Sequence, residues 1–154
     1  MDRDYLSDGE IDGLKATYPF LYFLPYYSIE NLFFHPDNLE EFYKSTNMPF
    51  DKEENISSFV KAKNTEKEEL LLGILQARAD YPFYKENENA KKLKDFRENF
   101  RDIAHLLRSD DFESFYKIFP AKDYGKEIRK RRNISKTALA KTNWFKHQIE
   151  KIIQ

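Results

Sequence analysis

The chain has 154 residues, of which 40% are hydrophobic and 16% aromatic, and its formal net charge is -1. This composition excludes an entirely disordered chain, and the length suits one domain with a core of its own. The absence of cysteine excludes disulfides and thiolate metal sites, and no apolar run reaches the roughly 20 residues of a membrane-spanning helix. We therefore expect a single cytoplasmic domain over residues 1–154.

The charges follow a gradient along the chain. Residues 1–60 hold 12 acidic and 4 basic side chains, whereas residues 122–154 hold 3 acidic and 10 basic ones. A basic end can attract phosphate groups over a Debye length of ~8–10 Å. The alternative is a solvated helix surface that offsets the acidic beginning.

The beginning of the chain combines a helix with a short apolar segment. Residues 7–17 predict a helix, because Ser7 can cap it and Glu10 completes a capping box. The run from residue 20 to residue 24 is continuously apolar, which is typical of a short buried strand. Pro25 ends this strand, because proline cannot donate a ladder hydrogen bond.

The rest of the chain has helical periodicity. We expect helices that begin at Pro36, at Thr65, near residue 89, at Asp110 and at Ser135. The helix over 89–108 carries the clearest apolar stripe, formed by Leu93, Phe96, Phe100, Ile103 and Leu107. The prediction is a mainly α (α+β) fold, a helical bundle with one or two short strands near the N-terminus. Residues 1–36 are its α/β part and residues 37–154 its helical part.

Three acidic residues are candidate metal ligands. Asp2 and Asp4 lie two positions apart, so an extended backbone would point both carboxylates the same way. Glu30 follows the next predicted strand and could meet them at a sheet edge. Hard cations such as Mg²⁺ prefer convergent oxygen ligands. The alternatives are a solvated acidic terminus for the two aspartates, and for Glu30 a place in the first turn of a helix capped by Ser28.

Two segments of the sequence, taken in their order along the chain, resemble part of a known domain family. The sequence Asp2-Arg3-Asp4-Tyr5 is followed by a helix, a short strand and then the segment Tyr27-Ser28-Ile29-Glu30-Asn31. This order resembles the later part of TOPRIM-type and DUF4435 domains, including those of overcoming-lysogenization-defect nucleases, which are fused or partnered to ABC- or AAA-type ATPases. The segment 141–145, followed by an apolar helix, also looks like the tail of such domains.

The resemblance implies a metal-dependent nuclease of an ATPase-coupled, anti-phage prokaryotic defence system. It assigns Asp2 and Asp4 to Mg²⁺, and Glu30 to the catalytic rim as a further ligand or support. An ABC- or AAA-type ATPase domain or subunit would be the partner. Nucleic acid would contact a basic segment, formed by Lys126, Arg129, Lys130, Arg131 and Arg132.

One departure from the family pattern changes the expected activity. TOPRIM domains carry a catalytic Glu on a strand before the Asp-x-Asp motif, and here Met1 directly precedes Asp2. We therefore expect a C-terminal fragment of a larger TOPRIM-like protein that binds Mg²⁺ poorly and is inactive alone.

Two other functions stay open from the sequence. The aromatic excess also suits a non-catalytic helical module for interaction or oligomerisation, and the basic end alone could bind nucleic acid. His35, His105 and His147 show no ligand spacing, and His105 looks structural. Among the aromatic residues near the predicted strand, we expect Tyr26 and Tyr27 to be exposed.

Overall fold

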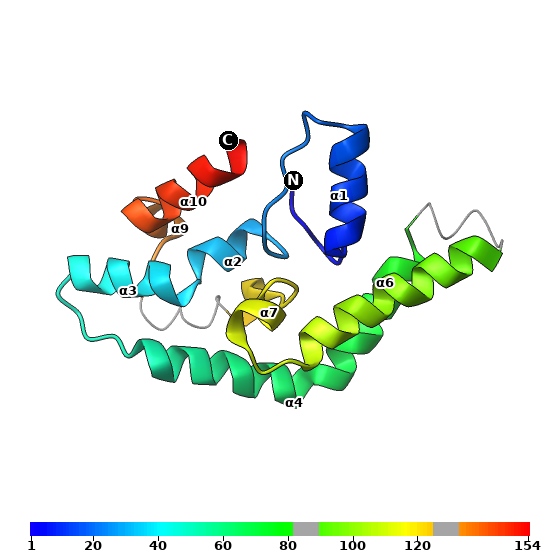
Figure 1. The fold of residues 1–154 in the computed structure, drawn as a ribbon. Helices are drawn as coiled ribbons and strands as arrows, with labels where there is room; N and C mark the ends of the chain where they lie inside the picture. Colours follow the sequence, from blue (N-terminus) through cyan, green and yellow to red (C-terminus); the bar gives the residue numbers. More distant parts are fainter. Residues whose placement is uncertain (82–89, 125–132) are drawn as a thin grey trace.

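The computed structural model describes residues 1–81, 90–124 and 133–154 of the chain, and the regular elements in these residues are all helices (Figure 1). The prediction of a mainly α fold is therefore confirmed. The helices are α1 (Asp8–Thr17), α2 (Ile29–Phe33), α3 (Pro36–Ser45), α4 (Lys52–Ala79), α6 (Ala90–Arg108), α7 (Phe112–Tyr116), α9 (Lys136–Leu139) and α10 (Asn143–Ile153).

Several helices begin where local capping signals predict. The Ser7 hydroxyl accepts a hydrogen bond from the Glu10 backbone N–H at 3.2 Å, and the Glu10 carboxylate accepts one from the Ser7 N–H at 2.8 Å. This confirms the capping box of α1. Pro36 occupies the first turn of α3, as predicted, and Ser135 caps α9.

Other predicted helix boundaries are wrong. Thr65 lies inside α4, where its hydroxyl donates to the Lys61 carbonyl at 2.8 Å. The helix begins instead after Asp51, whose carboxylate caps it, and no proline or other break separates the two positions. Similarly, α7 is capped by Asp111 and not by Asp110. The predicted last helix is divided into α9 and α10, because Thr142 caps a second start.

The short buried strand expected from Phe20 to Phe23 is not formed. Phe20 is 71% exposed, whereas a buried strand would bury it. Only a short extended stretch pairs with the first residues of the chain, and the sequence turns at Tyr18 before it and at Pro25 after it. Within the ranges given above, the expected small sheet is thus reduced to a few backbone hydrogen bonds.

Helix α4 is the long base on which the other helices pack (Figure 1). It contacts α6 over its second half, α7 near its middle and α3 near its beginning, while α10 packs on α2 and α3. The largest core cluster lies where these helices meet, and it consists of Leu24, Tyr26, Leu32, Phe59, Phe115, Tyr116, Phe119, Ala121 and Phe145.

Two fully buried cations on α4 are held by partners elsewhere in the chain. The Lys63 ammonium donates to the Ser109 carbonyl and to the Asp110 carboxylate, both at 2.8 Å. The Arg78 guanidinium makes a two-pronged ion pair with Glu10, at 2.7 and 2.8 Å. Since a buried charge without a partner is costly, these pairs set the position of α4 against α1 and the α6–α7 connection.

Candidate functional site

The first four residues of the chain lie beside residues 22–27. We call residues 2–4 the acidic turn. The Met1 amino group donates to the Tyr22 carbonyl at 2.6 Å, and the Leu24 N–H donates to the Met1 carbonyl at 2.9 Å. This is the hydrogen-bond pattern of two parallel strands. Helix α1 makes the connection between the two stretches, as in a β-α-β unit.

The pairing brings the Asp-x-Asp motif to the start of α2. The Asp4 N–H donates to the Tyr27 carbonyl at 2.9 Å, and the Asp2 carboxylate accepts from the Ile29 N–H at 3.2 Å. Asp4 has a φ of 51°, in the left-handed region that non-glycine residues adopt uncommonly. The two predicted motifs, far apart in sequence, are therefore adjacent in the fold.

The acidic turn is held from below by α4. The Arg78 guanidinium donates to the Tyr5 carbonyl at 2.9 Å while it is paired with Glu10. Arg3 in the turn donates to the Leu6 carbonyl at 3.0 Å and is paired with Asp8 at 2.9 Å. Both guanidinium groups are buried, so the turn is fixed by charged hydrogen bonds.

The carboxylates of the acidic turn repel one another. Burial raises the pKa of Asp4, and the negative charge of Asp2 raises it further. Burial also raises the pKa of the Tyr27 hydroxyl. A hydrogen bond with Tyr5 opposes this rise, and the charges of Asp4, Asp2 and Asp123 add to it. Asp123 is an acid of this neighbourhood that sequence reasoning did not single out. A nearby cation would relieve the repulsion.

Glu30 is engaged by a lysine. Its carboxylate accepts a hydrogen bond from the Lys136 ammonium at 2.8 Å, and its side chain is 12% exposed. Burial is the largest single influence and would raise the pKa of Glu30, but the hydrogen bonds from Lys136, from the backbone and from Ser28, with the positive charge of Lys136, together lower the pKa. Glu30 lies in the first turn of α2, as the alternative expected from sequence has it, but the Ser28 side chain makes no capping hydrogen bond to this helix.

The structure does not bring Asp2, Asp4 and Glu30 together as a metal-binding group. Asp2 and Asp4 provide two carboxylates, a number that Mg²⁺ sites commonly use together with water and phosphate oxygens. In the described ranges, no three histidine or acidic side chains form a group that could hold a metal ion. The basic segment formed by Lys126, Arg129, Lys130, Arg131 and Arg132 lies outside the described residues.

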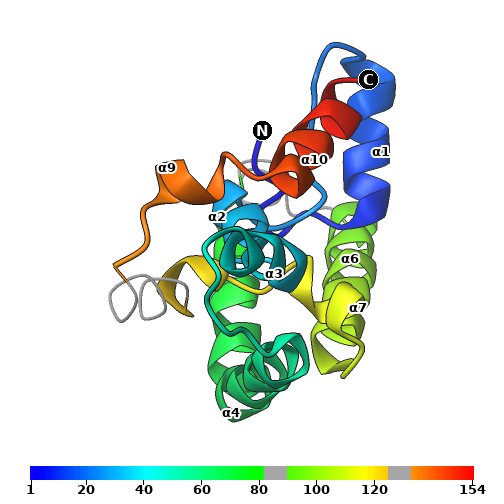
Figure 2. The same ribbon diagram turned by 90° about the vertical axis from the view of Figure 1, so that its left-hand side faces the viewer.

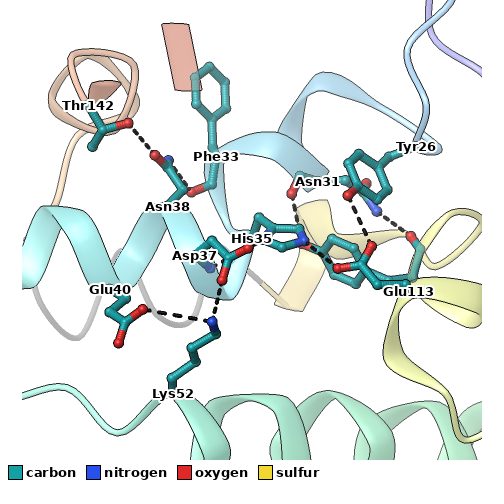
Figure 3. Close-up of polar contacts among 11 residues, drawn as sticks. Tyr26, Asn31, Phe33, His35, Asp37, Asn38, Glu40, Lys52, Glu113 and Thr142 are labelled. Atoms are coloured by element: carbon teal, nitrogen blue, oxygen red, sulfur yellow. Dashed lines mark hydrogen bonds and ion pairs between the residues drawn. The ribbon is translucent and has the colours of Figure 1, made fainter. Parts of the chain in front are cut away.

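A buried polar network around His35 is the second feature of the fold (Figure 3). The His35 ring accepts at Nδ1 from the Asp37 N–H, and its Nε2 lies 3.2 Å from the Glu113 carboxylate. This pattern assigns the ring hydrogen to Nε2, which donates to Glu113. The other carboxylate oxygen of Glu113 accepts from the Tyr26 hydroxyl at 3.2 Å.

The His35 network is structural. Only 2% of His35 is exposed, and rings of Tyr26, Phe112, Tyr116 and Trp144 surround it with centroids 4.6 to 5.6 Å away. Both ring nitrogens already have partners, so none is available to a substrate. The network joins the α2–α3 corner to α7.

Two asparagines complete this junction. The Asn31 side-chain amide donates to the carbonyls of Tyr116 and Phe119, at 2.9 and 2.8 Å. The Asn38 amide donates to the Phe33 and Leu139 carbonyls, and its oxygen accepts from the Thr142 hydroxyl (Figure 3). These long-range partners carry no local sequence signal.

Predictions for single residues have mixed outcomes. The Asn31 side-chain amide donates outside its own turn, to α7 and the segment after it. Tyr26 is buried rather than exposed, while Phe20 and Tyr22 are exposed. His105, expected to be structural, lies on the exposed side of α6. The partly buried Trp144 ring stacks on His35, with the ring centroids 4.6 Å apart.

Comparison of this chain with known protein families, curated proteins and solved structures assigns no function to it. No protein family, no curated protein and no solved structure matches this chain. Of the helices in the described ranges, none is long and apolar enough to cross a membrane.

Proposed function

We propose that this chain carries the Asp-x-Asp and Ile-Glu-Asn part of a TOPRIM/DUF4435-like, Mg²⁺-dependent nuclease. The observation that supports the proposal is the parallel pairing that joins Asp4 to Tyr27 and Asp2 to Ile29. A β-α-β connection that brings acidic residues to the ends of adjacent extended segments is the geometry in which open α/β domains place their ligand sites.

Asp2 and Asp4 would hold the metal ion. When bound, Mg²⁺ polarises a phosphate oxygen and lowers the pKa of the attacking water. The chain's own residues position the acids: Asp4 is held by the Tyr27 carbonyl, and the turn is fixed by Arg3 and Arg78. Glu30, paired with Lys136, supports the rim, and a further carboxylate would be needed for full activity.

By the same resemblance, an ABC- or AAA-type ATPase domain or subunit drives the nuclease in an anti-phage defence system. The basic segment 126–132 then contacts the nucleic-acid backbone. This part of the proposal depends on sequence alone.

The metal assignment can be tested by NMR with Mn²⁺. Paramagnetic broadening should affect the amides of Asp4, Tyr27 and Ile29 first, at Mn²⁺ concentrations on the order of 1 mM, because two carboxylates make a weak site. The variants Asp2→Asn and Asp4→Asn should lose the broadening. Asn keeps an acceptor for the Ile29 N–H and tolerates a left-handed φ, so both variants should fold.

The control is Asp12→Asn, which removes an exposed acid of α1 and should leave the broadening unchanged. Broadening that persists in both the Asp2→Asn and Asp4→Asn variants, or that centres on another acidic surface, would refute the metal assignment.

A second candidate function is a helical interaction module. It is favoured by large apolar side chains left exposed beside the acidic turn, with Phe20 at 71% and Met1 at 67%. Sedimentation of the purified chain tests self-association: a strictly monomeric chain at high concentration would exclude an oligomerisation role.

A further inference from the structure

An open groove of about 910 Å³ lies between α1, the segment 19–25 and the last turns of α10. Figure 1 shows this segment passing between α1 and α10, and Figure 2 shows the end of α10 beside α1. The groove is lined by apolar side chains that include Ile11, Leu21, Phe23 and Ile152. It is separate from the side of the acidic turn that meets α2.

Phe23, which lines the groove, has backbone groups without hydrogen-bond partners in the described residues. Met1 pairs with the carbonyl of Tyr22 and the N–H of Leu24. Because successive residues of an extended chain point to opposite edges, the N–H and C=O of Phe23 point away from Met1. In the described part of the chain neither group has a hydrogen-bond partner, although Phe23 is only 6% exposed. Unpaired backbone groups at a buried position are costly.

The charges around the groove are mainly positive. Arg3 and Asp8 in its wall form an ion pair with each other, so their charges offset. The other charged side chains that line the groove are three lysines and one aspartate: Lys15, Lys117, Lys151 and Asp12. In addition, the buried Nη2 of Arg3 has no hydrogen-bond partner in the described ranges. A ligand with acidic groups would complement this wall.

The rim of the groove is aromatic. Tyr22 lines it and is 47% exposed, and Phe20 extends from the same segment with the 71% exposure given above. Aromatic side chains are enriched in protein interfaces, and an extended peptide binds by adding a strand along unpaired backbone groups.

We propose that this groove binds an extended strand of another polypeptide, apolar in its centre and acidic at its ends, which pairs with the Phe23 backbone. Strand addition supplies main-chain hydrogen bonds for affinity, while the lysines select acidic flanks. The inference is independent of the metal assignment, because it uses the opposite edge of the extended segment.

The test begins by panning a phage library of random octapeptides against the full chain. We expect the enriched peptides to alternate β-branched or aromatic residues with polar ones and to carry Asp or Glu at their ends. A synthetic winner should shift the Phe23 amide resonance. N-methylation at its pairing position removes one hydrogen bond and should weaken binding about tenfold or more.

Charge reversal on the protein supplies the second measurement. Lys117→Glu and Lys151→Glu should each weaken binding about tenfold at low salt. Lys146→Glu is the matched control, since this exposed lysine of α10 lies outside the groove lining, and it should bind normally.

Four outcomes would overturn the proposal. They are no enriched peptide, enriched peptides that are basic or bind elsewhere, equal affinity for the N-methylated peptide, and a dimer of this chain that protects the Phe23 amide. The last outcome would assign the groove to a second copy.

Discussion

The buried ion pair between Glu10 and Arg78 offers the sharpest test of how the acidic turn is held. The Arg78 side chain is fully buried, the Glu10 side chain is 16% exposed, and two N–O contacts of 2.7 and 2.8 Å join them. Removing one partner of such a pair costs about 3–5 kcal/mol, because the remaining charge stays buried. Glu10→Gln should therefore lower the free energy of unfolding by about 3 kcal/mol, the lower limit being chosen because Glu10 keeps some exposure.

The glutamine isolates the effect of charge. It retains an oxygen that can accept from the Ser7 N–H, so the capping contribution of about 1 kcal/mol is largely kept. Urea denaturation measures the loss: with an m-value of about 2 kcal/mol/M, the midpoint should fall by about 1.5 M. Glu53→Gln, at an exposed position of α4, is the control and should change stability by less than about 0.5 kcal/mol.

A double-mutant cycle separates the pair from its surroundings. Glu10→Leu combined with Arg78→Met should be less destabilised than the sum of the single variants, with a coupling energy above about 1.5 kcal/mol. A loss below about 1 kcal/mol in Glu10→Gln, or additive single effects, would show that this pair does not fix the turn.

Three further predictions concern other parts of the molecule. Lys136→Met should raise the pKa of Glu30, which carboxyl NMR measures. In the unmodified protein the lowered pKa of Glu30 stabilises the fold above the usual glutamate pKa, and this stabilisation is lost as the pH falls through the pKa of the folded state. Phe59→Ala should lower the free energy of unfolding in urea by about 3–5 kcal/mol, because this ring is fully buried in the largest cluster; a loss below 1 kcal/mol would contradict the core described above. Arg129→Glu with Arg132→Glu should abolish salt-sensitive nucleic-acid binding in a fluorescence titration, and unchanged binding would exclude the basic segment.

Capping motifs and apolar periodicity in the sequence predicted that helices form more reliably than they predicted the residues at which the helices begin and end. The capping box of Ser7 and Glu10 forms as expected, because both partners lie within one turn. Thr65 and Glu68 have the same spacing and cap nothing, since the helix from Asp51 already continues through them. A capping motif thus specifies a start only when the preceding residues are not helical themselves.

In the candidate site, too, some contacts could be predicted from the sequence and others could not. The order of motifs predicted that the carboxylates of Asp2, Asp4 and Glu30 meet. Hydrogen bonds do join residues 2 and 4 to the segment after residue 26, but the three carboxylates form no metal-binding group in the described residues. The pairing of Glu30 with Lys136 could not be read from the sequence, because 106 positions separate the two residues. His35 was set aside because it lacked ligand spacing, and its role depends on packing between distant helices.

The first N–H groups of α10 are bound by a side chain of α3, about a hundred residues earlier in the chain. Glu41 of α3 accepts hydrogen bonds from the N–H groups of Asn143 and Trp144, at 2.9 and 2.7 Å. During synthesis the ribosome releases Glu41 about a hundred residues before these donors. Helix α10 therefore cannot dock before residues 143 and 144 have been synthesised, and until then the hydrophobic surface that it covers on α2 and α3 stays open to solvent.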